Sequence, residues 1–226
     1  SFFREHREWF WPHNDSSAYG QLCWHNQSLI KYLIGTVEGF LRDSRNVNAT
    51  LIDVSQNDNG DYCKDPEELA IVEEEQSGVG PILRAVNAIA DAIREEFPRI
   101  SVSTLAYDYG EQPPIKTQVR ENVAIRLCTG SMNFAQPITH DSNARFRAIV
   151  EGWRHKANAT RLRIWDYVVD SANPLQIFPN YLNLAPNIQY WAQLGVTQLY
   201  LEGPGLGDPA GAPTGPGPGT DMEELK

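Results

Sequence analysis

The chain has 226 residues, 41% of them hydrophobic, and a formal net charge of −10 at pH 7. That length and composition allow one sizeable buried core, so we expect a single domain over residues 1–226. The acidic balance argues against nucleic acid as a partner, because nucleic acid is bound by clustered Lys and Arg. No apolar run approaches the roughly 20 residues that cross a bilayer, so we expect no membrane insertion.

Two contrasting segments begin the chain. Residues 2–11 hold five aromatic side chains without a helical or strand period, which predicts a loop lying on a larger body. Asn26 or Ser28 is then suited to be a helix N-cap. Apolar residues follow at helical spacing from Leu29 to Leu41, which predicts an amphipathic helix.

A short apolar run that ends in polar residues is the most informative stretch of the chain. Residues 50–56 predict a buried strand, and the sequence then continues QNDNGD from Gln56. In parallel α/β proteins, ligands bind at the loops that follow the carboxyl ends of the strands. Asn57 and Asp58 are therefore candidate site residues. The alternative is an ordinary polar turn, because Asn, Asp and Gly are also the commonest turn formers.

Two helices are predicted next. The acidic run 66–76 predicts a short, solvated helix without a functional role. A longer apolar stripe predicts a helix over residues 80–97, with Pro81 in its first turn and Pro98 ending it.

The second half of the chain repeats this alternation. Further strands are predicted over residues 100–107, 122–128, 162–168 and 196–201. A helix is predicted around residues 146–153, and another begins at Pro186 and ends at Gly195, which has the character of a C′ residue.

Five mostly continuous apolar strands indicate a parallel sheet buried on both faces. Neither Gly-rich phosphate-binding motif follows a strand, which disfavours a doubly wound nucleotide-binding sheet. We therefore predict an α/β fold of the (β/α)₈ TIM-barrel type. Because a complete barrel needs eight strands and about 250 residues, we expect a partial barrel made of the last five βα units.

The C-terminal residues favour the same interpretation. Residues 203–219 are mostly Gly and Pro and predict a loop without a core of its own. Residues 220–223 read T-x-x-E, a capping box that announces a helix. We therefore expect this chain to be a fragment that lacks the remainder of its own protein.

The carboxyl ends of parallel strands meet at one rim, so the polar residues there should gather. One carboxylic acid that protonates a leaving oxygen, a second carboxylate and flat aromatic rings are what glycoside hydrolysis needs. The candidate catalytic residues are Asp58, Asp166 and Glu202. The candidate sugar-binding residues are Asn57, Tyr107, Tyr109, Trp165 and Tyr167. The alternatives are that Asp166 only hydrogen-bonds the backbone and that Trp165 is ordinary core.

Cysteines and glycosylation motifs bear on location and metal binding. N-x-Ser/Thr sequons occur at Asn14, Asn26, Asn48 and Asn158, which favours a secreted protein. Cys23 and Cys63 lie in predicted loops and could pair, while Cys128 lies in an apolar run as a buried thiol. With no C-x-x-C or H-E-x-x-H spacing, we expect no metal site and no cofactor.

Seven segments occur in an informative order: DVSQNDNGDYC, VNAIADAI, STLAYDYGEQPP, NVAIRLC, RIWDYVVD, NIQYWAQLGV and QLYLEG. Together they resemble an uncharacterised bacterial and algal family, a domain of unknown function, which is similar to α-glucuronidase and hexosaminidase-type (β/α)₈ glycosidases. The resemblance implies that residues 50–56 form the fourth barrel strand, with Asp58 at the position of the general acid. Several members of that family carry a cysteine cluster after this strand, of which only Cys63 is present here.

The expected function is therefore a glycoside-hydrolase-like domain that acts on or binds an oligo- or polysaccharide. Asp58 is the expected general acid, and Glu202 or Asp166 the second carboxylate. The alternative is a catalytically silent extracellular domain that binds glycans or serves as a structural module.

Overall fold

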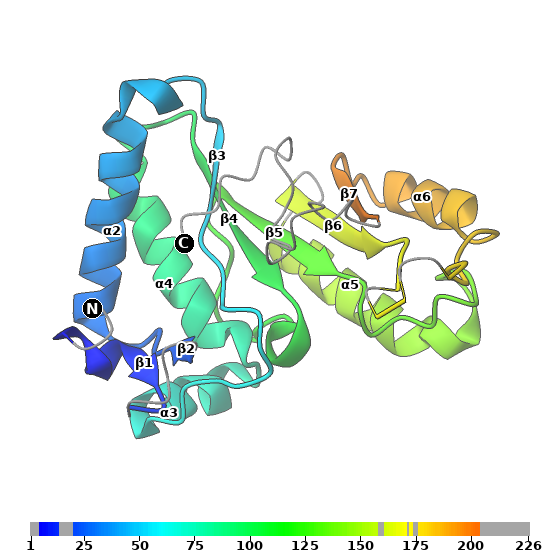
Figure 1. Ribbon diagram of the computed structural model, residues 1–226, viewed down its shortest axis with the longest axis horizontal. Helices are drawn as coiled ribbons and strands as arrows, with labels where there is room; N and C mark the ends of the chain where they lie inside the picture. Colours follow the sequence, from blue (N-terminus) through cyan, green and yellow to red (C-terminus); the bar gives the residue numbers. More distant parts are fainter. Residues whose placement is uncertain (1–4, 14–19, 158–160, 171, 174–175, 204–226) are drawn as a thin grey trace.

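A computed structural model of the chain describes residues 5–13, 20–157, 161–170, 172–173 and 176–203. Five parallel strands pair in chain order and form a curled sheet, a half-barrel (Figure 1). The strands are β3 (Leu51–Asp53), β4 (Ser101–Ala106), β5 (Val123–Cys128), β6 (Leu162–Tyr167) and β7 (Leu199–Glu202). The mixed α/β class and the parallel sheet agree with the sequence prediction.

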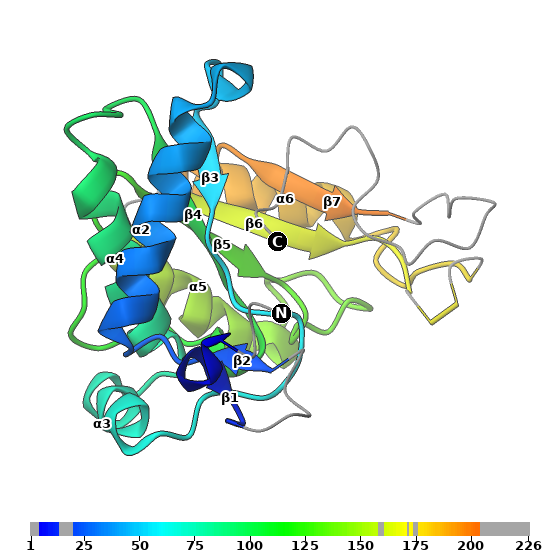
Figure 2. The same cartoon turned by 60° about the vertical axis from the view of Figure 1, so that its left-hand side comes forward.

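The helices are α2 (Gln27–Arg42), α3 (Pro66–Glu75), α4 (Val79–Ile93), α5 (Ala144–Ala157) and α6 (Leu184–Gln193). Helices α4 and α5 pack on strands of the sheet, and α2 and α3 pack on α4. Figures 1 and 2 show α2 and α4 side by side near β3 and β4, with α5 against β5 and β6. A two-stranded antiparallel sheet, β1 (Phe10–Trp11) and β2 (Gln21–Leu22), follows a 3₁₀ turn at Arg7–Trp9. Further 3₁₀ turns lie at Ser44–Asn46, Asp108–Gly110 and Asp141–Asn143.

The two faces of the half-barrel differ in chemistry. Side chains on the convex face, such as Ile52, Ile125 and Ile164, are buried against the helices in one hydrophobic core. On the concave face, the register places Asp53 beside Ser103, and Cys128 beside Trp165. Burial alternates along β6, because its concave residues remain partly exposed. The prediction that both faces are buried therefore holds for β5 but not for the whole sheet.

The predicted helices form with small differences in length. Asn26 caps α2, since its side chain accepts hydrogen bonds from the backbone N–H groups of Ser28 and Leu29. Gly195 has a φ of 83° just after α6, as expected of a C′ glycine. The strand predicted at 50–56 is shorter, and the one predicted at 196–201 lies later. Residues 204–226, with most of the Gly/Pro-rich stretch and the capping box, lie outside the described residues, as do Asn14 and Asn158.

The acidic helix α3 was correctly predicted as a helix but not as a solvated one. Glu68 is 4% exposed and Glu75 is fully buried. Glu75 accepts hydrogen bonds from the backbone N–H groups of Lys116 and Thr117, and from the Thr117 hydroxyl and the Arg84 guanidinium. Glu75 thereby fixes the long connection between β4 and β5 to α3. Glu68 holds the N-terminal segment instead, since it accepts from the backbone N–H groups of Trp24 and His25.

A disulfide fixes the N-terminal segment to the loop after β3. Cys23 pairs with Cys63, with 5.1 Å between their Cα atoms, which is the pairing that the sequence allowed. Cys128 is a buried free thiol, as predicted. Among the described residues, no helix has the length and apolar character needed to cross a bilayer.

Candidate functional site

The carboxyl ends of the strands bring five polar side chains to one rim of the half-barrel. We call Asp58, Tyr107, Cys128, Tyr167 and Glu202 the rim cluster. Cys128, Tyr167 and Glu202 are the last residues of β5, β6 and β7, and Tyr107 directly follows β4. The parallel register places Tyr167 beside Glu202. Asp58 joins them from the loop that follows β3.

The first contact in the rim cluster joins Tyr107 to the loop after β3. The Tyr107 hydroxyl donates to Asp58 Oδ1 over 3.1 Å and lies 3.3 Å from the Asn57 carbonyl oxygen. Burial, and then the negative charge of Asp58, raise the pKa of Tyr107 well above its usual value. The Tyr107 phenol therefore stays protonated at neutral pH. As a hydrogen-bond donor, it orients the carboxylate of Asp58, which is exposed.

Tyr167 lies beside Glu202 in the register of β6 and β7, and near the Cys128 thiol. Burial raises the pKa of Tyr167, and the nearby Cys128, Glu202 and Asp58 raise it further. Burial also raises the pKa of Cys128 to about 12, so this residue is a neutral thiol beside the Tyr167 hydroxyl.

A chain of contacts crosses the concave face below the rim. The Trp165 indole donates to Glu202 Oε2 over 2.7 Å, and its ring centroid lies 4.2 Å from that of Tyr200. The Arg126 guanidinium lies over the same indole, 5.5 Å from its centroid. Arg126 also forms an ion pair with Asp53 at 3.3 Å. Carboxylates of the first and last strands are thus linked through one guanidinium and one indole.

Asp53 and Arg126 were missed by sequence reasoning. Each is a single charged residue within an apolar run, and the run as a whole was interpreted as a buried strand. The signal was their spacing: residues two apart in a strand share a face, and Asp53 shares its face with Leu51 while Ile52 and Val54 are buried on the other.

Asp166 does not join the rim cluster. It is 1% exposed and shares the convex face of β6 with Leu162 and Ile164. Its carboxylate accepts from the Thr129 hydroxyl over 2.6 Å and from the backbone N–H of Tyr167 over 3.0 Å. Burial raises its pKa, while these hydrogen bonds oppose the rise. The geometry therefore separates Asp166 from Glu202, its neighbour in the predicted site.

Two predicted sugar-binding residues also have other contacts. The Asn57 carboxamide donates to the Gly20 carbonyl oxygen over 2.5 Å, so it holds the segment that leads into β2. The Tyr109 ring lies against Tyr62, with 5.7 Å between centroids, and burial raises its pKa. Tyr107, Trp165 and Tyr167 are the predicted aromatic residues that face the rim and the concave surface.

A further carboxylate near the rim, that of Glu111, was also missed by sequence reasoning. It accepts a hydrogen bond from the Ser131 hydroxyl and forms an ion pair with Arg145 at 3.1 Å. Its backbone carbonyl accepts from the Trp153 indole over 2.8 Å. These contacts fix the loop after β4 to the loop after β5, which makes Glu111 a structural residue of the rim.

Comparison with known proteins identifies the family and nothing narrower. No curated protein matches the chain. The family described as "Domain of unknown function (DUF4838)" matches residues 1–226, and the chain therefore belongs to that family of unknown function.

Proposed function

We propose that the rim cluster and the concave face below it bind carbohydrate, and that the domain is a glycoside hydrolase. In this proposal Asp58 protonates the leaving glycosidic oxygen, and Glu202 stabilises or attacks the oxocarbenium-like centre. The observation that supports it is the geometry of the rim, where Tyr107 donates a hydrogen bond to Asp58 and the register of β6 and β7 places Tyr167 beside Glu202. Asp166 is left out because of its place on the buried face.

The aromatic residues suit the binding of a sugar. Trp165 is held by its hydrogen bond to Glu202 and by the Arg126 guanidinium over its ring, so its orientation is fixed before a ligand arrives. A sugar that covers Tyr107 and Tyr167 would lie beside Asp58, whose side chain is oriented by the hydrogen bond from the Tyr107 hydroxyl.

We also propose that the half-barrel is part of a (β/α)₈ barrel. Within the described residues, the edge strands β3 and β7 are each paired on one side only. The buried Ser103 hydroxyl on the concave face has no hydrogen-bond partner among those residues, and a buried polar group without a partner is costly. Further strands would satisfy both edges. The likeness to glycosidase barrels is an argument by analogy, because a fold does not determine a function.

A secreted location belongs to the same proposal. The Cys23–Cys63 disulfide is a bond that persists in oxidising compartments. Of the sequons within the described residues, Asn48 is exposed, whereas the Asn26 carboxamide caps α2. Asn48 is therefore the better acceptor for a glycan.

The test is hydrolysis of a panel of aryl glycosides and oligosaccharides. We expect Asp58→Asn to lower kcat/KM by roughly 10²–10⁴-fold, the usual effect of losing an acid–base group. Glu202→Gln should lower kcat/KM as well, because it removes the second carboxylate. Asp61→Asn is the matched control, because Asp61 lies in the same loop but pairs with the exposed Lys64. Hydrolysis that survives Asp58→Asn would show that Asp58 is not the acid.

The second candidate is a catalytically silent glycan-binding domain. It is favoured by Glu202, whose carboxylate already accepts a hydrogen bond from the Trp165 indole. Calorimetric titration with the same oligosaccharides separates the two candidates. Binding that is lost in Trp165→Ala but unaffected in Asp58→Asn, with no turnover in either protein, would support the silent domain.

A further inference from the structure

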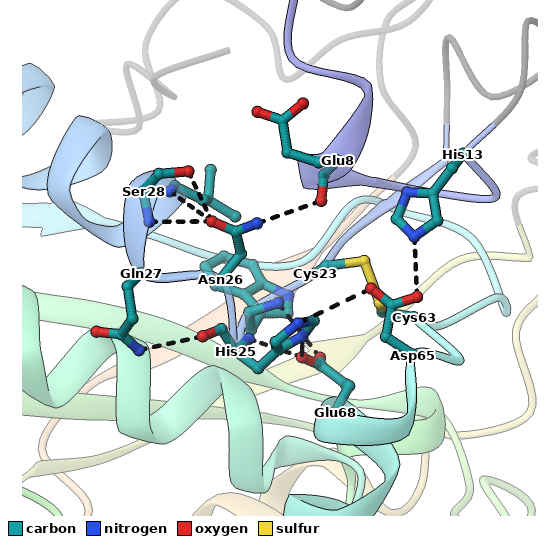
Figure 3. A network of polar contacts seen from close by, with 12 residues as sticks. Glu8, His13, Cys23, His25, Asn26, Gln27, Ser28, Cys63, Asp65 and Glu68 are labelled. Carbon is teal, nitrogen blue, oxygen red and sulfur yellow. Dashed lines mark hydrogen bonds and ion pairs between the residues drawn. A yellow bond between two sulfur atoms is a disulfide. The ribbon is translucent and has the colours of Figure 1, made fainter.

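A second polar cluster lies away from the rim, where the N-terminal segment meets α3. It consists of two imidazoles, two sulfurs and two carboxylates (Figure 3). We call it the disulfide cluster, and its members are His13, Cys23, His25, Cys63, Asp65 and Glu68. Both sulfurs are buried, while the His25 and Asp65 side chains are partly exposed. None of these residues takes part in the proposed carbohydrate site.

The two imidazoles have the same hydrogen-bonding pattern. Nδ1 of His13 lies 3.0 Å from the Arg7 carbonyl oxygen, and Nδ1 of His25 lies 3.0 Å from Glu68 Oε2. Each Nε2 is directed at the Asp65 carboxylate, at 2.8 Å from His13 and 3.8 Å from His25. Proteins commonly fix metal-binding histidines in this way, with one ring nitrogen held by a carbonyl or carboxylate and the other directed at the metal.

This pattern calls for positive charge beside Asp65. A neutral ring that donates from Nδ1 presents a lone pair at Nε2, and that lone pair would face a carboxylate oxygen. The repulsion is relieved by a proton or by a metal ion.

The sulfurs complete two half-sites. The ligand atoms of His13, Cys23 and Asp65 lie within 4.8 Å of one another, and so do those of His25, Cys63 and Glu68. While the sulfurs are bonded to each other, neither is a thiolate. Two thiolates bound to one tetrahedral zinc ion lie about 3.8 Å apart, given Zn–S bonds of about 2.3 Å. The disulfide and a shared metal ion therefore exclude each other.

We propose that, once the Cys23–Cys63 disulfide is reduced, this cluster binds one Zn²⁺ ion through Cys23, Cys63, His13 and His25. A dithiol reductant gives two electrons and two protons to the disulfide and becomes a disulfide itself. Zinc then replaces the two thiol protons, which are released to solvent, and binds the unprotonated Nε2 of each imidazole. Glu68 continues to hold Nδ1 of His25, and Asp65 turns toward solvent.

The metal ion and the disulfide would be alternative cross-links between the same two segments of the chain. Both connect the segment that carries His13, Cys23 and His25 to the loop that carries Cys63 after β3. The two segments would stay cross-linked by the metal ion under reducing conditions, when the disulfide bond is broken. The ligands come from separate segments of the chain, which is why the spacing of its cysteines and histidines did not predict a metal site.

The test is metal titration of the reduced protein. The chain is reduced anaerobically with a phosphine, which is removed before Co²⁺ is added as a spectroscopic substitute for Zn²⁺. We expect tetrahedral d–d bands and thiolate-to-cobalt charge-transfer bands that saturate at one equivalent and disappear when Zn²⁺ is added. The oxidised protein should show neither. The same bands in the oxidised protein, or none in the reduced protein, would overturn the proposal.

Variants test the two histidines and exclude binding by an unfolded chain. The double variant His13→Ala/His25→Ala should bind Co²⁺ more than about tenfold more weakly, while His155→Ala, an exposed histidine on α5, should match the wild type. Zn²⁺ should raise the Tm of the reduced wild type, because a ligand of the folded state stabilises it. An unchanged or lower Tm would mean that zinc binds only thiols of the unfolded chain, and the proposal would fail.

Discussion

Glu75→Gln is the substitution that most directly tests how this fold is held together. The Glu75 carboxylate is fully buried and accepts hydrogen bonds from Arg84, Lys116 and Thr117. Burial alone would raise its pKa, but the hydrogen bonds from Thr117, Arg84 and Lys116 outweigh burial and lower it from 4.5 to about 2. Glutamine keeps the shape of the side chain but removes the charge, and it turns an NH₂ group toward donors.

The size of the effect follows from the pKa. Each pKa unit corresponds to about 1.4 kcal/mol, so a lowering from 4.5 to about 2 stabilises the fold by about 3 kcal/mol at neutral pH. The pKa of the folded state is the lower one, so this stability is complete above the unfolded value of 4.5 and is lost as pH falls toward 2. The difference between wild type and Glu75→Gln should shrink over the same pH range.

Urea denaturation followed by tryptophan fluorescence measures both quantities. Glu74→Gln is the matched control, because Glu74 also contacts Arg84 and Lys116 but is exposed. We expect Glu74→Gln to change the unfolding midpoint only slightly, since exposed ion pairs contribute little. Equal losses in the two variants, or a Glu75→Gln effect that stays constant down to pH 2, would refute this account of Glu75.

Two further substitutions test local structure, one through the free energy of unfolding in urea and one through Tm. Asn26→Ala removes the cap of α2, which accepts from the N–H groups of Ser28 and Leu29, and should cost about 1 kcal/mol in urea denaturation. Gly78→Ala places a Cβ atom 2.5 Å from the Tyr109 carbonyl oxygen, so it should lower Tm clearly. Gly35→Ala is its control: no atom lies within 4 Å of the added Cβ, so this helical position should be unchanged or stabilised.

The sequence predicted the helices better than the faces of the strands. In α2 and α4 the apolar stripe indicates which side is buried, because α2 packs that side on α4, and α4 packs on β4 and β5. In β6 an alternating pattern was present as well: Leu162 and Ile164 share a face with Asp166, and Trp165 takes the other. Applying that two-residue period would have placed Asp166 in the core while leaving Trp165 on the opposite face, where it was predicted to bind sugar.

Other features had no local signal. Nothing in the run of glutamates in α3 distinguishes Glu75 from Glu74, because the difference arises from the Thr117 and Lys116 groups about 40 residues away. The disulfide cluster has the same character, since each sulfur meets a histidine and a carboxylate from separate stretches of chain. Such groupings depend on tertiary structure, and residue spacing along the chain cannot predict them.

The composition of the concave face is the strongest physical argument for placing a site there. The interior of a typical (β/α)₈ barrel is filled by layers of branched aliphatic side chains. In this half-barrel the concave face carries Asp53, Arg126, Trp165 and Glu202, joined in one chain of contacts. Removing a carboxylate and a guanidinium from water costs more than a packed aliphatic core would. A face built from such residues is better suited to hold a polar ligand than to pack a core, which is why we place the proposed carbohydrate site on it.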